Sequence, residues 1–253
     1  MLISSLTGIP LVQPGDDLVK ILIIALSENS INLTQGDIIV VAQKIVSKSE
    51  GRLVCLQNVK PSPRAYELSS ITKKDARLVE LVLEESREVL RAAKDVLIVE
   101  HKRGFICANA GIDHSNVQGP GLDSKDWVLL LPEDSDASAN KIREGLEEYS
   151  GLTLGVMIID SHGRAWRKGT VGVSIGMSGI PGLVDLRGEE DLYGNRLRVS
   201  EVGAGDELAA AASLVMGQAS ERTPLVHVRG FPYPLRESCI TEIFRPRDID
   251  LFR

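Results

Sequence analysis

Acidic and small polar side chains gather at two points of the sequence, and both groups could hold a divalent metal ion. Asp113 stands in NAGIDHSN after the short apolar run FICAN, with Asn116 three residues further on. Asp160 and Ser161 close the apolar run LGVMIID, and an aspartate at the carboxyl end of a buried strand commonly faces a ligand crevice. Carboxylate and hydroxyl oxygens suit Mg²⁺ or Mn²⁺. Turns are the alternative reading, because Asp and Asn form Asx-turns freely.

Cations and glycines beside these groups favour an anionic ligand. Arg164, Arg167 and Lys168 follow the second group and could bind phosphate or carboxylate. The glycine-rich run from Gly169 to Gly182 could bring backbone N–H groups close to a phosphate, although tight packing or a bulged strand explains it almost as well. The segment from Lys44 to Gly51 carries two lysines after an expected strand, where it could grip a nucleotide or form a solvated turn.

A third acidic position opens an alanine-rich segment. Asp206 and Glu207 could simply stabilise the dipole of a helix that starts there. Alternatively, Glu207 completes an all-oxygen site with Asp113 and Asp160, which would suit Mg²⁺ or Mn²⁺ better than zinc. The histidines show no HxxxH spacing, and His162 is the one nearest to a proposed site, where we expect a solvated or supporting position.

Short apolar strands and amphipathic helices must position these residues. The patterns predict buried strands at 37–42, 96–100, 127–131, 154–160 and 225–229, and a half-exposed strand at 197–202. They predict helices at 16–26, 74–93, 137–149 and 206–216. The elements follow no strict βαβ rhythm, and the Rossmann and Walker A fingerprints are absent. We therefore expect an α+β class, with a single domain over 1–253 and a subdomain boundary near 132–138.

Composition narrows the classes of function. The chain has 253 residues and a net charge of −6, and no basic run suggests binding to nucleic acid. No apolar run reaches the roughly 18–20 residues of a membrane helix, and the start lacks the features of a signal peptide. The three cysteines are widely spaced, which argues against a disulfide framework and favours a cytoplasmic location.

Taken in order, several segments resemble one family, the coenzyme F-420 γ-glutamyl ligases. The segments are TGIPL, PGDD, GDIIVVAQKIVSKSEGR, VLEESREVL, NAGIDHSN, DSHGRAWRKGTVGVSIGMSG, DLYGN and GDELAAAASLVMG. Their order and spacing are specific, and they run over almost the whole chain. The resemblance implies a mixed α and β fold with two intertwined subdomains that dimerise.

The resemblance also implies a reaction. GTP would phosphorylate the terminal carboxylate of a deazaflavin precursor, and the amine of L-glutamate would displace the phosphate to build a γ-linked tail. Metal ions, Mg²⁺ or Mn²⁺ with K⁺ as a further candidate, would neutralise the phosphates. We expect GTP, L-glutamate and the deazaflavin precursor as small-molecule partners, a homodimer, and neither nucleic acid nor membrane as a partner.

Roles carry over where the motifs match. Asp113, Asp160 and Ser161 look like metal ligands, with Glu207 as a further metal or nucleotide ligand, and Arg164 joins the two aspartates among the expected catalytic residues. The expected GTP contacts are Ile9, Pro10, Leu11, Val12, Gln43, Lys48 and Asn116. Ser161 replaces a threonine common in the family, and Gln43 stands where the family often has a serine. A related ligase with another acceptor and a non-catalytic nucleotide-binding protein are the alternatives.

Overall fold

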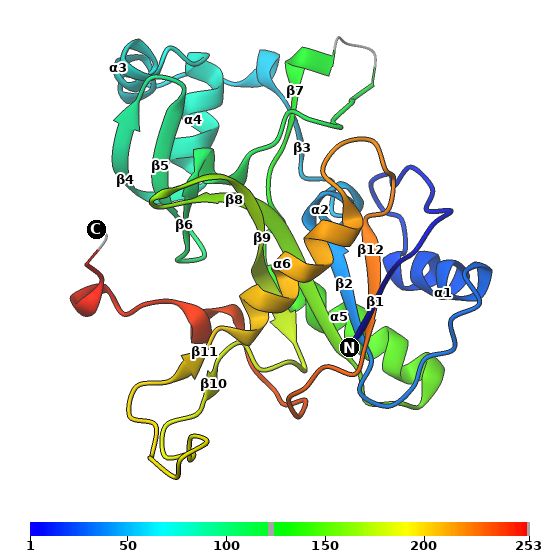
Figure 1. Cartoon of the computed structure of the whole chain (residues 1–253). Coiled ribbons are helices and arrows are strands. Elements are labelled where there is room, and N and C mark those ends of the chain that lie inside the picture. The colour runs from blue at the N-terminus through cyan, green and yellow to red at the C-terminus, as the bar shows by residue number, and fades with distance from the viewer. Residues whose placement is uncertain (121–123, 252–253) are drawn as a thin grey trace.

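A five-stranded sheet forms the centre of the molecule (Figure 1). The structure, a computed structural model, describes residues 1–120 and 124–251. The strands lie in the order β1 (Leu2–Ser5), β12 (Leu225–Arg229), β2 (Ile38–Ala42), β8 (Gly155–Arg164) and β9 (Arg167–Ser178). The β2–β8 pair is parallel and the other pairs are antiparallel. The parallel pair matters most for the site, because it aligns the carboxyl ends of two strands.

Helices cover both faces of this sheet. On one face, α1 (Leu18–Glu28) and α5 (Ser135–Ser150) contribute to one apolar core, and α6 (Ala204–Met216) contributes to a second core on the other face. Figure 1 shows α6 crossing in front of the sheet and α5 behind it. The alternation of side chains along a strand divides β2 between these cores, with Ile39 and Val41 in the first and Ile38 and Val40 in the second.

A smaller α+β unit lies beside the sheet, at the upper left of Figure 1. It contains α3 (Pro63–Thr72), α4 (Ala76–Glu84) and the sheet β4 (Ser86–Ala93), β5 (Val96–His101) and β6 (Ile106–Ala108). The chain reaches it through α2 (Gln43–Ser49) and β3 (Leu53–Cys55), and returns through β7 (Trp127–Leu129), which pairs with β3. This unit has its own apolar core, so the expected α+β class is confirmed.

The remaining elements are short. The pair β10 (Val184–Asp185) and β11 (Glu201–Val202) forms an arm that projects from the sheet (Figure 1). Single 3₁₀ turns lie at Leu56–Asn58, Asn109–Gly111, Ser124–Asp126, Ile240–Ile243 and Arg247–Ile249. Within the described residues, no helix is both long and apolar enough to cross a bilayer.

Most predicted elements are confirmed, but the helix predicted at 74–93 is wrong in its second half. The helix α4 ends at Glu84, and β4 begins at Ser86. Val89 and Leu90 continue the helical spacing, yet β4 pairs along its length with β5, so pairing outweighs a local pattern that fits either state. The strand predicted at 197–202 is reduced to β11. The strand predicted at 127–131 ends at Leu129.

Two further expectations change near the proposed site. The segment after β2 is the helix α2 and not a solvated turn. The strand predicted to end at Asp160 continues to Arg164 and turns back into β9 as a long hairpin.

Glycines in β9 permit close helix packing. A Cβ atom at Gly172 would lie 2.5 Å from the carbonyl oxygen of Ala209 in α6, and one at Gly176 would lie 2.5 Å from that of Ser135 in α5. Glycine is required where another backbone approaches this closely. At these two positions the packing explanation of the glycine-rich run is therefore confirmed.

Candidate active site

The proposed site lies at the carboxyl end of the parallel β2–β8 pair. The last paired residues of these strands are Ala42 and Ile159. Gln43 and Lys44 follow at once in the first turn of α2, while Asp160 is the next residue of β8. Because parallel strands end at the same edge, these side chains meet there, as expected for ligand sites in sheets with parallel strands.

Asp113 reaches this edge from the loop after β6. Its backbone exchanges two hydrogen bonds of 2.9 Å with Leu129 at the end of β7. Its carboxylate accepts a hydrogen bond of 2.6 Å at Oδ2 from Nε2 of Gln43, and the same oxygen forms an ion pair with Nζ of Lys44. Burial raises the pKa of Asp113, the charge of Asp160 adds to this rise, and Lys44 opposes it. The two aspartates therefore share one electrostatic environment.

Asp160 has a different partner and the opposite pKa shift. Its Oδ2 accepts a hydrogen bond of 2.9 Å from Nε2 of His162. Burial opposes ionisation of Asp160, but the hydrogen bond and charge of His162, with the backbone hydrogen bond of Ser161 and the charge of Lys44, outweigh it and hold the pKa of this carboxyl below its ordinary value. The His162 ring lies 5.8 Å from that of Phe105, which in turn stacks on His101 at 4.7 Å. Two carboxylates with separated pKa values are typical of functional sites.

Lys48 and Asn116, two of the predicted GTP contacts, lie together at one side of the site. Nζ of Lys48 donates a hydrogen bond of 2.9 Å to the backbone oxygen of Asn116, whose side chain donates to the oxygen of Ala219 at 3.1 Å. Burial lowers the pKa of Lys48, and the charge of Lys44 lowers it further. An anion beside these lysines would oppose both effects, because an opposite charge raises the pKa of a lysine.

The segment from Ile9 to Val12 lies in the loop between β1 and α1. Val12 is buried in the core beneath that loop, with Ile9 packed against the same core, whereas Pro10 and Leu11 are exposed. The amide of Gly15 donates a hydrogen bond of 2.8 Å to the oxygen of Ser49, which fastens the loop to the end of α2. The loop is therefore tied to the helix that carries Lys48.

Three other predicted residues are not brought to the carboxylates. The hydroxyl of Ser161 donates to Oε1 of Gln218 at 2.8 Å, and strand alternation directs it to the side opposite Asp160. Arg164 lies at the end of the hairpin and donates to the oxygen of Gly169 at 3.0 Å. It follows Asp160 by four strand residues, or about 13 Å. Glu207 is exposed in the first turn of α6. The roles expected of Ser161, Arg164 and Glu207 in metal binding and catalysis therefore remain predictions.

Asp206, next to Glu207, is the acidic residue of α6 that contacts the sheet, whereas the sequence pattern led us to expect Glu207 at the site. Its Oδ1 accepts a hydrogen bond of 3.0 Å from the amide of Ser174 in β9. Helix periodicity contains the signal, because residues seven positions apart share a face. Asp206 shares the face of the buried Ser213, whereas Glu207 shares that of the exposed Leu214.

The two aspartates fit a magnesium-type ion. Among the described residues, Oδ1 of Asp113 has no hydrogen-bond partner, since Gln43 and Lys44 both contact Oδ2. No group of three His, Cys, Asp or Glu side chains within those residues is arranged around a metal position. Mg²⁺ commonly takes one or two carboxylates and fills its other positions with water and substrate phosphates. The carboxylates of Asp113 and Asp160 are of the type that such an ion takes, and their role as its ligands stays a prediction.

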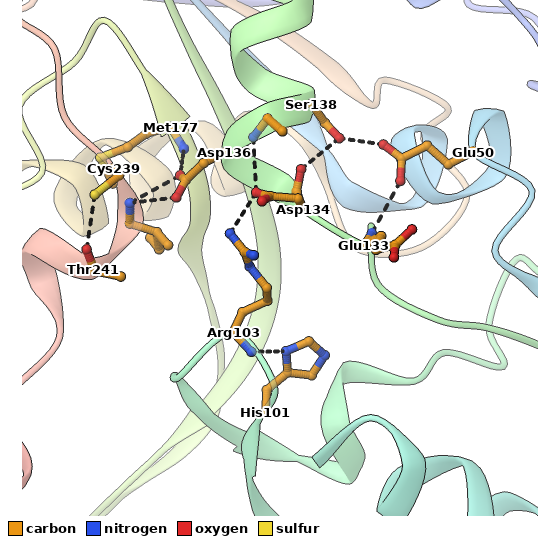
Figure 2. A network of polar contacts seen from close by, with 12 residues as sticks. Glu50, His101, Arg103, Glu133, Asp134, Asp136, Ser138, Met177, Cys239 and Thr241 are labelled. Carbon is orange, nitrogen blue, oxygen red and sulfur yellow. Dashed lines mark hydrogen bonds and ion pairs between the residues drawn. The ribbon is translucent and has the colours of Figure 1, made fainter. Parts of the chain in front are cut away.

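A polar network lies at the start of α5 (Figure 2). Asp134 caps the helix and accepts a hydrogen bond of 2.7 Å from Arg103 in the β5–β6 turn. The carboxylate of Glu50, just after α2, accepts hydrogen bonds from Ser138 and from the amide of Glu133. The network therefore joins α2, the smaller unit and α5. An open groove beside it is lined by Glu50, Arg52, Glu133, Asp134, Ala137, Ser138 and Lys141.

Comparison with known proteins agrees with the resemblance seen in the segments. The model of the family described as F420-0:Gamma-glutamyl ligase matches residues 8–230. The protein named Coenzyme F420:L-glutamate ligase of Methanothermobacter thermautotrophicus is 48% identical over 248 residues, which cover 97% of this chain and 96% of the relative. The protein of the same name from Archaeoglobus fulgidus is 40% identical over 246 residues, covering 97% and 94%.

Proposed function

Because this chain belongs to the F420-0:gamma-glutamyl ligase family, we propose that it joins L-glutamate to a deazaflavin coenzyme precursor at the expense of GTP. The family accounts for the ligase class and for glutamate as the added group. The observation that carries the site is the ion pair of Lys44 with Asp113, formed beside Asp160 of β8, so that the charge of Asp160 raises the pKa of Asp113 and the charge of Lys44 lowers that of Asp160.

The proposed reaction has two steps. A carboxylate oxygen of the acceptor attacks the γ-phosphorus of GTP, so that an acyl phosphate forms and GDP leaves. The amine of L-glutamate, having lost a proton from its ammonium form, then attacks the acyl carbon, the C–N bond forms, and inorganic phosphate leaves. Most of the catalysis in such steps comes from positioning and charge.

Different residues of this chain would supply the positioning and the positive charge that these steps need. Asp113 and Asp160 would hold Mg²⁺ or Mn²⁺, which supplies positive charge to the phosphates when bound. Lys44 and Lys48 add two cations within the same electrostatic environment, suited to the γ-phosphate and its neighbours. The backbone beside Asn116, where Lys48 is already held, would keep that lysine in place before GTP arrives. A role for K⁺ belongs to the same proposal.

A ligation assay followed by mass spectrometry tests this function. Purified protein is incubated with the deazaflavin precursor, L-glutamate, GTP and Mn²⁺, with controls that contain ATP in place of GTP or no metal. We expect the precursor to gain glutamyl units only with GTP and metal. Absence of product while GTP still binds would redirect the assignment to a related ligase with another acceptor. Absence of both would refute the nucleotide site.

The proposal extends to a homodimer. Light scattering of the purified chain measures its mass directly, and the mass of a monomer at micromolar concentration would contradict this part.

A further inference from the structure

A line of three polar side chains leads from the interior of α2 to the carboxylate of Asp113. Oγ of Ser47 donates a hydrogen bond of 2.9 Å to Oε1 of Gln43, whose Nε2 donates one of 2.6 Å to Oδ2 of Asp113. Gln43 is 1% exposed and Ser47 is 0% exposed. Water therefore has little access to either side chain.

The carboxylate of Asp113 determines which group donates and which accepts in each of these hydrogen bonds. A carboxylate only accepts hydrogen bonds, so the NH₂ end of the Gln43 amide must face Asp113. The amide oxygen then faces Ser47, whose hydroxyl must donate. Serine in a helix can also donate to the backbone oxygen four residues before it. Here the hydroxyl of Ser47 donates instead to the side chain of the residue at that position.

The arrangement leaves one oxygen of Asp113 for a ligand. Oδ2 receives both the Gln43 amide and the Lys44 ammonium, whereas Oδ1 has no hydrogen-bond partner among the described residues. We propose that Ser47 is a positioning residue that, through Gln43, directs Oδ1 of Asp113 toward the metal ion. This inference rests on the metal dependence of the proposed function. It assigns Gln43 to the support of a metal ligand and not to direct contact with GTP.

The size of the effect follows from other metal sites. Residues that orient a ligand through a hydrogen bond typically change metal affinity about 10–100-fold when they are removed. Ser47 acts at one remove from Asp113, so we expect Ser47→Ala to weaken Mn²⁺ binding about 10-fold. Alanine suits a helix interior, and the helix itself should therefore persist.

The test measures Mn²⁺ binding to the purified protein without GTP, from the electron paramagnetic resonance signal of free Mn²⁺. Ser49→Ala is the matched control, because Ser49 lies on the same helix and, among the described residues, its hydroxyl donates only to the backbone oxygen of Val46 at 2.8 Å. Wild type and Ser49→Ala should bind Mn²⁺ equally, and Ser47→Ala about 10-fold more weakly. Equal affinity in all three proteins would overturn the proposal, as would a wild type that binds no Mn²⁺.

A double-mutant cycle separates positioning from a general packing defect. Gln43→Met removes the amide with little change in volume. If Ser47 acts through Gln43, then Ser47→Ala causes no further loss of Mn²⁺ affinity in the Gln43→Met background. A full additional loss there would contradict the inference.

The activity readout distinguishes this inference from the proposed function. If the protein ligates glutamate, Ser47→Ala should lower kcat at a Mn²⁺ concentration near the wild-type Kd and leave the KM for GTP nearly unchanged; the reverse pattern would contradict it. The alternative outcome is that the wild type ligates nothing while Ser47→Ala still weakens Mn²⁺ binding, and does so only when Gln43 is present. In that case the proposed function fails and the positioning role of Ser47 stands.

Discussion

Asp37, at the opposite end of β2 from the site, gives a sharp test of how this strand is held. Asp37 is 1% exposed. Its carboxylate accepts hydrogen bonds from Arg229 at 2.7 and 2.9 Å, from His227 at 2.8 Å and from the amide of Thr34 at 2.9 Å. The informative change is Asp37→Asn, which removes the charge and keeps the size of the side chain.

The expected magnitude comes from the pKa. Burial alone would raise the pKa of Asp37, but the hydrogen bonds from Arg229 and His227 outweigh it and lower the pKa from 3.8 to about 2. One pKa unit is worth about 1.4 kcal/mol, so the ionised form of this side chain contributes about 2.5 kcal/mol. Because the pKa is lower in the folded protein, this stability is complete above pH 3.8 and is lost as the pH falls toward 2.

Urea unfolding at several pH values measures this contribution. At pH 7, Asp37→Asn should lower the free energy of unfolding by about 2.5 kcal/mol, and the gap to wild type should close between pH 4 and pH 2. Asp185→Asn is the control, because Arg187 also lowers the pKa of Asp185 to about 2, but on the exposed surface. There we expect no measurable change. A gap that does not vary with pH, or an equal effect of both variants, would refute the reasoning.

Four further predictions concern the site and its support. Asp113→Asn should abolish most Mn²⁺ binding and ligation while the thermal unfolding midpoint stays near that of wild type; near-normal turnover would exclude Asp113 as a metal ligand. Lys48→Ala should raise the KM for GTP about 10-fold or more, as expected for loss of a charged hydrogen bond, and an unchanged GTP dependence would exclude a phosphate contact. Gly172→Ala should lower the free energy of unfolding in urea by about 1–3 kcal/mol, because its Cβ would overlap α6. Gly163→Ala on the same hairpin meets open space and should change this free energy little. Equal decreases in the two variants would contradict the packing argument. Burial lowers the pKa of His101 to about 4. The free energy of unfolding should therefore decrease as the pH falls from 6.5 toward 4, because the unfolded chain binds this proton more readily than the folded protein does. Over that interval the free energy of unfolding should decrease less in His101→Phe than in wild type.

The elements whose apolar side chains recur at one clear spacing were predictable from the sequence. The buried run of β2 and the helices α5 and α6 form close to their predicted bounds, because apolar side chains at one spacing leave a single way to bury them. The stretch after Glu84 was not predictable in this way, since its apolar residues fit a helix and a bulged strand alike. Its partner, β5, decided the outcome.

The candidate site was predictable as a pair of aspartates but not as an arrangement. The place of Asp113 and Asp160 after apolar runs predicts both residues, and in the structure the charge of Asp160 raises the pKa of Asp113. The partnership of Asp113 with Gln43 depends on residues 70 positions apart in the chain, which local patterns do not encode. Ser161 shows the same limit, because the strand proved longer than its apolar run and strand alternation turned its hydroxyl away from Asp160.

The position of Asp113 has a consequence for how the protein assembles. This residue belongs to the loop that leaves the smaller unit, whereas Asp160 belongs to the central sheet and is synthesised later. On the ribosome the two carboxylates can meet only after β8 has paired with β2, a contact between distant parts of the chain that forms late because closing so long a loop costs conformational entropy. A ligand that bridges them binds the complete fold and no fragment of it. By mass action, such a ligand stabilises the entire molecule against global unfolding and couples the smaller unit to the sheet.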